Sequence, residues 1–279
     1  MNVDLFRESL RYYNSRYIII QGHIRKLGGV SKKINKLFKE VMEELHPEMI
    51  LTIIIYNNDK NSFERKLNLI ERNDIKKLSA VLDSAISKKN MDIIKIIFNY
   101  ANDVKKMFDT YDLMRLVFHY GNPEYIKYIE SWGVNYKNNI DIYLVSACNT
   151  GNMEMIKFAH QNGADIVNNT TAVRNVILLR NLEVVKYLCE NGANINNYDI
   201  LNCVLITEDI DIINYIYTLD KNIINETALK ILVKKSFIDI IIHLNENNMI
   251  NQEHKNIILE EARKLKKSNI INYLSKIEN

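Results

Sequence analysis

The chain has 279 residues, of which 47% are hydrophobic and 25% are charged. These proportions are typical of a folded protein and exclude an intrinsically disordered one. The formal charge of +3, from 37 basic and 34 acidic residues, is too small to indicate attraction to nucleic acid or to a membrane surface. With only two prolines and eight glycines, the chain lacks the turn residues of an all-β fold, so its composition predicts an all-α protein.

Two features of the sequence indicate where the protein is located. The N-terminus lacks the basic region and apolar run of a secretory signal, and the apolar residues 17–20 are far too few to cross a bilayer. The three cysteines, Cys148, Cys189 and Cys203, lie in apolar stretches, as expected of buried thiols in a reducing compartment. We therefore expect a cytoplasmic protein without a membrane-spanning segment.

Residues 1–46 do not share the pattern of the rest of the chain. Apolar residues recur there at helical spacing on one face: Ile34, Leu37, Phe38, Val41 and Leu45. The end of a stacked array must be covered because it would otherwise expose its stacking surface. We interpret residues 1–46 as a helical N-terminal segment that either caps the array or serves as a docking element.

Residues 47–75 allow two interpretations. Glu64 lies 28 residues before Asp92, the first residue of a regular series, but Arg65 and Lys66 stand where apolar residues are expected. We therefore interpret residues 47–75 as a degenerate repeat. The alternative is a docking element for a ubiquitin ligase at residues 45–56, because Leu45-His46-Pro47-Glu48-Met49-Ile50 resembles the opening of an F-box.

Residues 76–279 contain a recurring segment that begins with an acid or an asparagine and continues with two apolar residues and, most often, a lysine. The segments begin at Asp92, Glu124, Glu154, Glu183, Asp211, Asp239 and Asn269, with successive spacings of 32, 30, 29, 28, 28 and 30 residues. This period is too long for a heptad and predicts stacked repeats. Apolar residues such as Val184, Val185 and Leu188 fall on one helical stripe, which we expect to be buried.

Each repeat is predicted to be a pair of helices. Nine residues after five of the segment starts come Gly133, Gly163, Gly192, Asp220 and Asn248, which are residue types that tolerate the left-handed conformation at a helix end. A second apolar-patterned stretch precedes each segment, for example at residues 142–150 and 171–179. We expect the segment lysines to form weak exposed pairs with the segment acids.

The residues of two repeats resemble a known family. Asn181-Leu182-Glu183-Val184-Val185-Lys186-Tyr187-Leu188, with Gly192-Ala193-Asn194 after it, resembles an ankyrin repeat, as does Gly151-Asn152-Met153-Glu154-Met155-Ile156-Lys157. The resemblance extends from about Leu78 to the C-terminus, although the family's Thr-Pro-Leu-His opening is reduced to Thr171-Ala172-Val173-Arg174.

The composition of these repeats, rich in Asn, Ile, Lys and Tyr, is similar to that of ankyrin-repeat proteins of large DNA viruses. The resemblance implies an all-α, ankyrin-like helix-pair solenoid of six or seven pairs. It also implies a host protein as partner and the host cell cytoplasm as location.

Signals of catalysis are weak in this sequence. It contains no Gly-rich phosphate loop and no Gly-x-Ser-x-Gly motif, and its six histidines lack metal-ligand spacing. Cys148 and His160 fall on different helices of a pair and do not form a nucleophile and base. We therefore expect a protein that is not an enzyme, with no catalytic residues, metal site, cofactor or small-molecule substrate.

Ankyrin-like arrays bind partners on the concave face formed by their first helices, and two residues at the end of each first helix are not needed for stacking. We predict that these residues contact a protein partner: His119, Tyr120, Asn149, Thr150, Leu178, Leu179, Ile206, Thr207, Lys234 and Lys235. Leu178, Leu179 and Ile206 would form an apolar patch with polar neighbours, which favours a protein over other partners.

Two alternatives remain open for these residues. Tighter packing between the repeats could bury the two leucines, in which case they would not contact a partner. The lysines of the groove could instead bind nucleic acid, which the small net charge disfavours.

Overall fold

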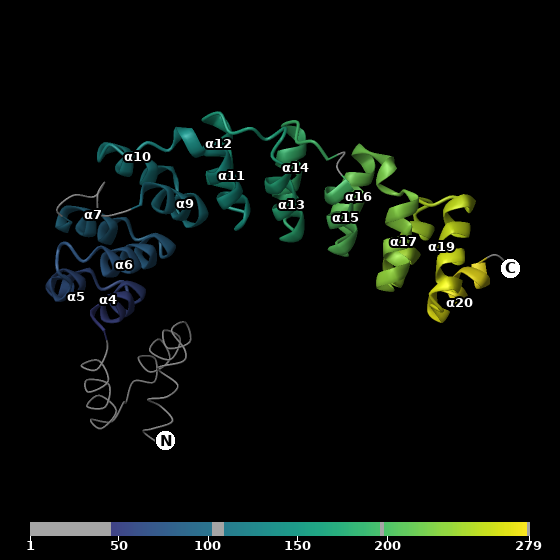
Figure 1. The fold of residues 1–279 in the computed structure, drawn as a ribbon, viewed down its shortest axis with the longest axis horizontal. Coiled ribbons are helices and arrows are strands. Elements are labelled where there is room, and N and C mark those ends of the chain that lie inside the picture. The colour runs from purple at the N-terminus through teal and green to yellow at the C-terminus, as the bar shows by residue number, and fades with distance from the viewer. Residues whose placement is uncertain (1–45, 102–108, 196–197, 278–279) are drawn as a thin grey trace, which may run out of the picture. The chain divides into compact units, whose positions relative to one another are not determined.

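The computed structural model describes residues 46–101, 109–195 and 198–277, and the chain divides into two compact units, Met1–Tyr136 and Lys137–Asn279 (Figure 1). Residues 1–45 of the expected N-terminal cap lie outside the described residues.

The first unit contains three described helix pairs. They are α4 (Pro47–Tyr56) with α5 (Lys60–Lys66), α6 (Ile75–Ser87) with α7 (Met91–Tyr100), and α9 (Thr110–Tyr120) with α10 (Pro123–Ser131). The short 3-10 helix η1 (Leu67–Leu69) follows α5. The first helix of each pair packs on the first helix of the next, α4 on α6 and α6 on α9.

The second unit contains five described pairs. They are α11 (Ile140–Cys148) with α12 (Met153–Gln161), α13 (Thr170–Leu178) with α14 (Leu182–Glu190), α15 (Tyr198–Ile206) with α16 (Ile210–Leu219), α17 (Glu226–Lys235) with α18 (Ile238–Glu246), and α19 (Gln252–Lys264) with α20 (Ser268–Ile277). The 3-10 helices η2 (Lys137–Asn139) and η3 (Lys221–Ile223) lie between pairs. The first helices α11, α13, α15, α17 and α19 stand side by side in one row (Figure 1).

The described residues therefore hold eight helix pairs, where the sequence predicted six or seven. The pair α4 with α5 falls in residues 47–75, which the sequence analysis interpreted as a degenerate repeat, and its second helix has only seven residues. All regular elements in the described ranges are helices. The fold is the all-α, ankyrin-like stack of helix pairs that the sequence predicted.

The first helices carry apolar residues in adjacent pairs one turn apart. In α13 these are Ala172, Val173, Val176 and Ile177, each at most 2% exposed. Because α13 packs on both α11 and α15, a stripe this wide can contact both neighbours. Burial of each valine or isoleucine side chain contributes about 1.5–3 kcal/mol, so packing between repeats stabilises the stack.

Asparagine and aspartate residues start most of the second helices. Six of these helices follow a side chain that accepts a hydrogen bond from a backbone N–H three residues later: Asp59, Asn90, Asn122, Asn152, Asn181 and Asp209. Such N-caps contribute about 1 kcal/mol each. The cap at Asp59 places Phe63 at the buried position that Ile94 occupies after Asn90. The counterpart of Asp92 in this pair is therefore Asn61, and the alignment on Glu64 was wrong by three residues.

Left-handed residues occur at two places in the repeats. Gly133, Gly163, Gly192 and Asn248 have positive φ at the ends of second helices, which confirms the prediction. Asp220 was wrongly predicted, because its φ is −146° and its side chain instead accepts a hydrogen bond from the N–H of Asn222. A second set with positive φ lies between the two helices of a pair: Asn58, Lys89, Gly151, Arg180, Glu208, Ser236 and Lys266.

Several lysines on the second helices contact aromatic rings rather than the acids expected. The ammonium group of Lys157 lies 5.5 Å from the ring centre of Tyr187, and that of Lys186 lies 5.6 Å from Tyr215, in each case on the next repeat. Exposed contacts of this kind contribute about 0.5–1 kcal/mol.

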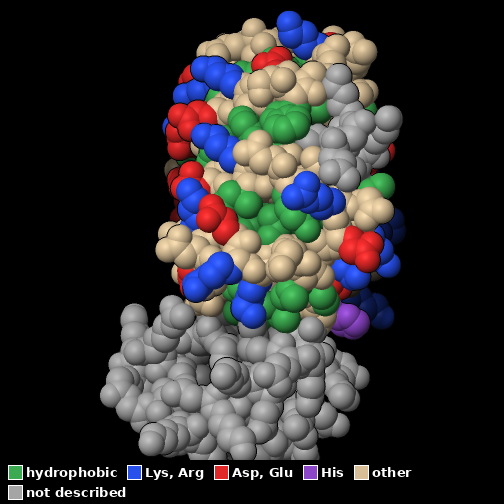
Figure 2. All heavy atoms as spheres, turned by 90° about the vertical axis from the view of Figure 1, so that its left-hand side faces the viewer, with side chains coloured by type: hydrophobic (Ala, Val, Ile, Leu, Met, Phe, Trp, Pro, Cys, Tyr) green, Lys and Arg blue, Asp and Glu red, His purple; other side chains and the backbone are tan. Residues whose placement is uncertain are grey.

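Figure 2 looks onto the first unit, where basic and acidic side chains alternate along one edge beside separate hydrophobic patches.

Candidate partner-binding surface

The first helices of the second unit share an exposed stripe. In α13 it contains Thr171, Arg174 and Leu178, which are spaced three and four residues apart and are all exposed. This spacing places them on one side of the helix, away from the buried stripe. The exposed residues Thr227, Lys230 and Lys234 repeat the pattern in α17. We call this side of the helices the first-helix face.

The predicted apolar residues are exposed on this face. Leu178 is 48% exposed, Leu179 is 46% exposed and Ile206 is 43% exposed. Leu178 precedes the left-handed residue Arg180 by two positions, as Ile206 precedes Glu208. The two side chains thus occupy the same position in neighbouring repeats. The packing alternative would require buried leucines, and these side chains are not buried.

Thr207 must be removed from the predicted surface. Its side chain is only 3% exposed. Its hydroxyl donates a hydrogen bond of 2.7 Å to the carbonyl of Val204 and accepts one of 3.3 Å from the N–H of Asp209. Thr207 therefore stabilises the turn between α15 and α16 and does not face a partner.

Lys234 and Lys235 lie at the end of α17, and both are exposed. Within the described residues neither forms an ion pair or a hydrogen bond through its side chain. Lys230, one turn earlier, is paired with Glu226. Sequence reasoning missed Arg174, although its place four residues before Leu178 puts it on the same stripe.

Asn149 and Thr150 end the first helix of the preceding repeat, and both are exposed. The side-chain amide of Asn175 donates a hydrogen bond of 2.6 Å to Asn149, which joins α11 to α13. The hydroxyl of Thr150 donates to the carbonyl of Ala147 at 3.2 Å. The end of α11 is therefore polar, whereas the ends of α13 and α15 carry the exposed apolar residues Leu178, Leu179 and Ile206.

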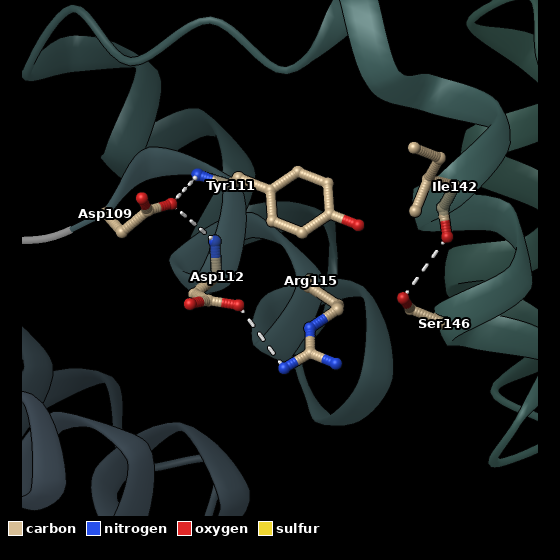
Figure 3. Close-up of polar contacts among 6 residues, drawn as sticks. All are labelled: Asp109, Tyr111, Asp112, Arg115, Ile142 and Ser146. Carbon is tan, nitrogen blue, oxygen red and sulfur yellow. Dashed lines mark hydrogen bonds and ion pairs between the residues drawn. The ribbon is translucent and has the colours of Figure 1, made fainter.

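His119 and Tyr120 end helix α9 in the first unit. Their rings meet edge to face with centres 4.3 Å apart, and Tyr120 is 38% exposed. Figure 3 shows the start of the same helix, where the Asp109 carboxylate accepts hydrogen bonds from the N–H groups of Tyr111 and Asp112. Asp112 also pairs with Arg115 at 3.3 Å.

Figure 3 also shows α11 of the second unit, where the Ser146 hydroxyl donates to the carbonyl of Ile142 at 3.2 Å. Ser146 is buried while Ile142 is 42% exposed. The hydrogen bond satisfies the buried hydroxyl within its own helix, so Ser146 serves α11 itself.

Two of the cysteine thiols have raised pKa values. Burial raises the pKa of the Cys148 thiol to about 12, and burial followed by the charge of Glu190 raises that of Cys189 to about 11. Both thiols are therefore protonated near neutral pH, whereas a nucleophilic cysteine must be a thiolate. His160 hydrogen-bonds through Nδ1 to the hydroxyl of Tyr187 at 2.9 Å.

The described residues contain no group of three or more His, Cys, Asp and Glu side chains that could hold a metal ion. None of the helices in these ranges has the length and apolar character needed to span a bilayer.

Residues 45–56, the possible docking element for a ubiquitin ligase, lie mostly in α4. Leu51, Ile54 and Ile55 are buried, and α4 packs on α6 with a hydrogen bond of 3.2 Å between Thr52 and Ser84. These apolar side chains are thus occupied by contacts within the first unit. Leu45 lies outside the described residues.

The comparisons with known proteins agree with this fold. An ankyrin repeat protein of Acanthamoeba polyphaga mimivirus is 28% identical over 168 aligned residues, which cover 46% of this chain and 26% of the relative. The match thus spans about a quarter of the relative's length. No family model and no solved structure matches the chain. In both its helix-pair repeats and its sequence, the chain is similar to the divergent ankyrin-repeat proteins of large DNA viruses.

Proposed function

We propose that this protein is a non-catalytic scaffold that binds another protein through the first-helix face of its second unit. The observation that carries the proposal is the exposure of Leu178, Leu179 and Ile206 at equivalent places on neighbouring repeats. Large apolar side chains that lie together on a surface mark sites of protein contact more often than scattered ones do. Their backbone already lies in regular helices, so binding requires little ordering of the chain.

The surroundings of this apolar centre support a protein partner. Asn149 and Thr150 lie on one side of it, and Lys234 and Lys235 lie on the other. A polar border around an apolar centre is the usual composition of a protein interface. The likeness to a viral protein supports a host protein as the partner and the host cell cytoplasm as the site of action.

The proposal is tested by affinity capture from host-cell lysate with the intact chain and with the double variant Leu178→Asp, Leu179→Asp. The captured protein is then purified and its affinity for both chains is measured directly. We expect the double variant to bind at least tenfold more weakly, because truncating or charging the centre of an interface commonly costs more than about 1.4 kcal/mol.

A matched control is the double variant Val167→Asp, Leu219→Asp. Both of these residues are 50% exposed in the same unit, but they lie outside the ends of the first helices. Circular dichroism should show that both variants remain helical. Equal loss of binding in both variants, or no loss in either, would show that the first-helix face is not the binding site.

A further inference from the structure

The first-helix face changes in chemistry from one repeat to the next. At the position two residues before the left-handed residue, it carries Asn149 directly after α11, Leu178 in α13, Ile206 in α15 and Lys234 in α17. The next position carries Leu179 directly after α13 and Lys235 at the end of α17. We call Leu178, Leu179, Ile206, Lys234 and Lys235 the α13–α17 patch. It is apolar at α13 and α15 and basic at α17.

Two of the acids near the basic end of the patch are already paired with other lysines. Glu226 is paired with Lys230, and Glu261 of the neighbouring α19 is paired with Lys264 at 3.6 Å. Glu208 is an exposed acid at the end of α15, beside the apolar part of the patch. In the described part of the chain, Lys234 and Lys235 have no carboxylate partner of their own.

We infer that the α13–α17 patch binds an acidic amphipathic segment of a protein partner. Apolar side chains of that segment contact Leu178, Leu179 and Ile206, and its carboxylates pair with Lys234 and Lys235. The inference rests on the proposed function and adds to it the chemistry of the bound segment. Complementary charges of this kind set orientation and exclude wrong partners.

The packing of the first helices sets the length of the segment. Packed helices lie about 8–10 Å apart, so the distance from α13 to α17 is about 16–20 Å. An extended peptide covers this distance in about six residues, and a helical one covers it in about 12. In the bound segment, the acids should therefore lie about six residues from the first apolar contact residue if the segment is extended. They should lie about 12 residues from it if the segment is helical.

The same features disfavour a nucleic acid on this patch. Single-stranded nucleic acid is usually held by lysines together with aromatic rings on which bases stack. The α13–α17 patch has lysines only at one end, and its other members are aliphatic. The aliphatic side chains of Leu178, Leu179 and Ile206 cannot stack on bases or pair with phosphates, whereas they complement apolar side chains of a peptide.

The inference is tested with the full chain and a displayed library of random peptides about 16 residues long, which exceeds the helical span of about 12. We expect the enriched peptides to combine apolar residues with a cluster of acids at one end. A fluorescein-labelled enriched peptide is then used for anisotropy titrations against purified variants. In the variant Lys234→Glu, Lys235→Glu, two attractive pairs become repulsive, so its affinity should fall about tenfold or more.

The matched control is Lys127→Glu, Lys276→Glu. It makes the same change in net charge at exposed lysines of the second helices α10 and α20, and we expect it to bind the peptide as the unmodified chain does. A peptide in which lysines replace the acids should regain affinity for the Lys234→Glu, Lys235→Glu variant. This exchange of charges shows direct pairing, which a general change of stability would not produce.

The outcomes separate this inference from the proposed function. If Leu178→Asp, Leu179→Asp abolishes peptide binding while Lys234→Glu, Lys235→Glu leaves it unchanged, the patch binds protein but the acidic segment is refuted. If enriched peptides bind all variants alike, or if none is enriched, the inference fails, and the proposed function is decided separately by the capture experiment with Leu178→Asp, Leu179→Asp. Binding of labelled single-stranded DNA that depends on the same lysines would also overturn the inference.

Discussion

Replacement of Asn181 by alanine tests how the asparagine residues support the repeats. The side-chain oxygen of Asn181 accepts a hydrogen bond of 3.2 Å from the N–H of Val184 and so starts helix α14. Loss of such a cap costs about 1 kcal/mol. The second unit has about 140 residues, and an unfolding entropy of about 2.1 cal/mol/K per residue gives about 0.3 kcal/mol/K. Asn181→Ala should therefore lower the midpoint of thermal unfolding by about 3 °C.

The assay is thermal unfolding followed by far-ultraviolet circular dichroism, with Asn181→Asp as the control. Aspartate keeps the acceptor oxygen and adds a charge that is favourable at a helix N-terminus, so its midpoint should match that of the unmodified chain. The amide nitrogen of Asn181 also lies close to Gly151, because a Cβ added there would come within 2.6 Å of it. If Asn181→Asp destabilises as much as Asn181→Ala, the contact with Gly151 matters more than the cap and the reasoning is refuted.

Two further predictions concern strain and burial. Arg180 has a φ of 55°, which costs a non-glycine residue about 1–2 kcal/mol. Arg180→Gly removes this cost but loses about 0.5–1 kcal/mol, because glycine is more flexible in the unfolded state. The net free energy of unfolding, measured by urea titration, should therefore rise by about 0.5–1 kcal/mol. A lower midpoint of unfolding would contradict this. The hydroxyl of Tyr125 is buried without a hydrogen-bond partner, and burial, with a smaller effect of Glu124, raises its pKa from 10.0 to about 12. A raised pKa means that this group's contribution to stability is complete below pH 10 and is lost as the pH rises toward 12. Tyr125→Phe should therefore be at least as stable at neutral pH and should lose less stability between pH 10 and 12, and an unchanged alkaline profile would argue against the assignment.

The helix-pair repeat was readable from the sequence because it depends on local patterns. The spacing of 28 to 32 residues between segments and the apolar stripe at Val184, Val185 and Leu188 predicted helices that are buried as expected. Glycines at helix ends were also readable, since only a few residue types tolerate positive φ. Where those signals are absent, as at Lys89 and Glu208, the left-handed residues could not be predicted.

The candidate site was predicted only in part. Leu178, Leu179 and Ile206 were identified because ankyrin-like repeats usually carry polar residues where these stand. Thr207 fills the same position in α15 that Leu179 fills in α13, yet its hydroxyl turns inward to the carbonyl of Val204 and the side chain is buried. A threonine hydroxyl can hydrogen-bond to a nearby backbone carbonyl and turn inward, whereas a leucine side chain has no hydrogen-bonding group. The sequence does not show whether the threonine turns inward or toward the solvent.

The sequence by itself determined that this protein is a stack of helix pairs, because period, apolar spacing and helix-end residues are properties of neighbouring residues along the chain. The tertiary structure alone decided contacts between repeats. It placed Lys157 over the ring of Tyr187, whereas the sequence predicted that this lysine pairs with an acid. It also joined Asn175 to Asn149 by a hydrogen bond. Such contacts join residues 26 to 30 positions apart, and their geometry depends on how one helix pair packs on the next.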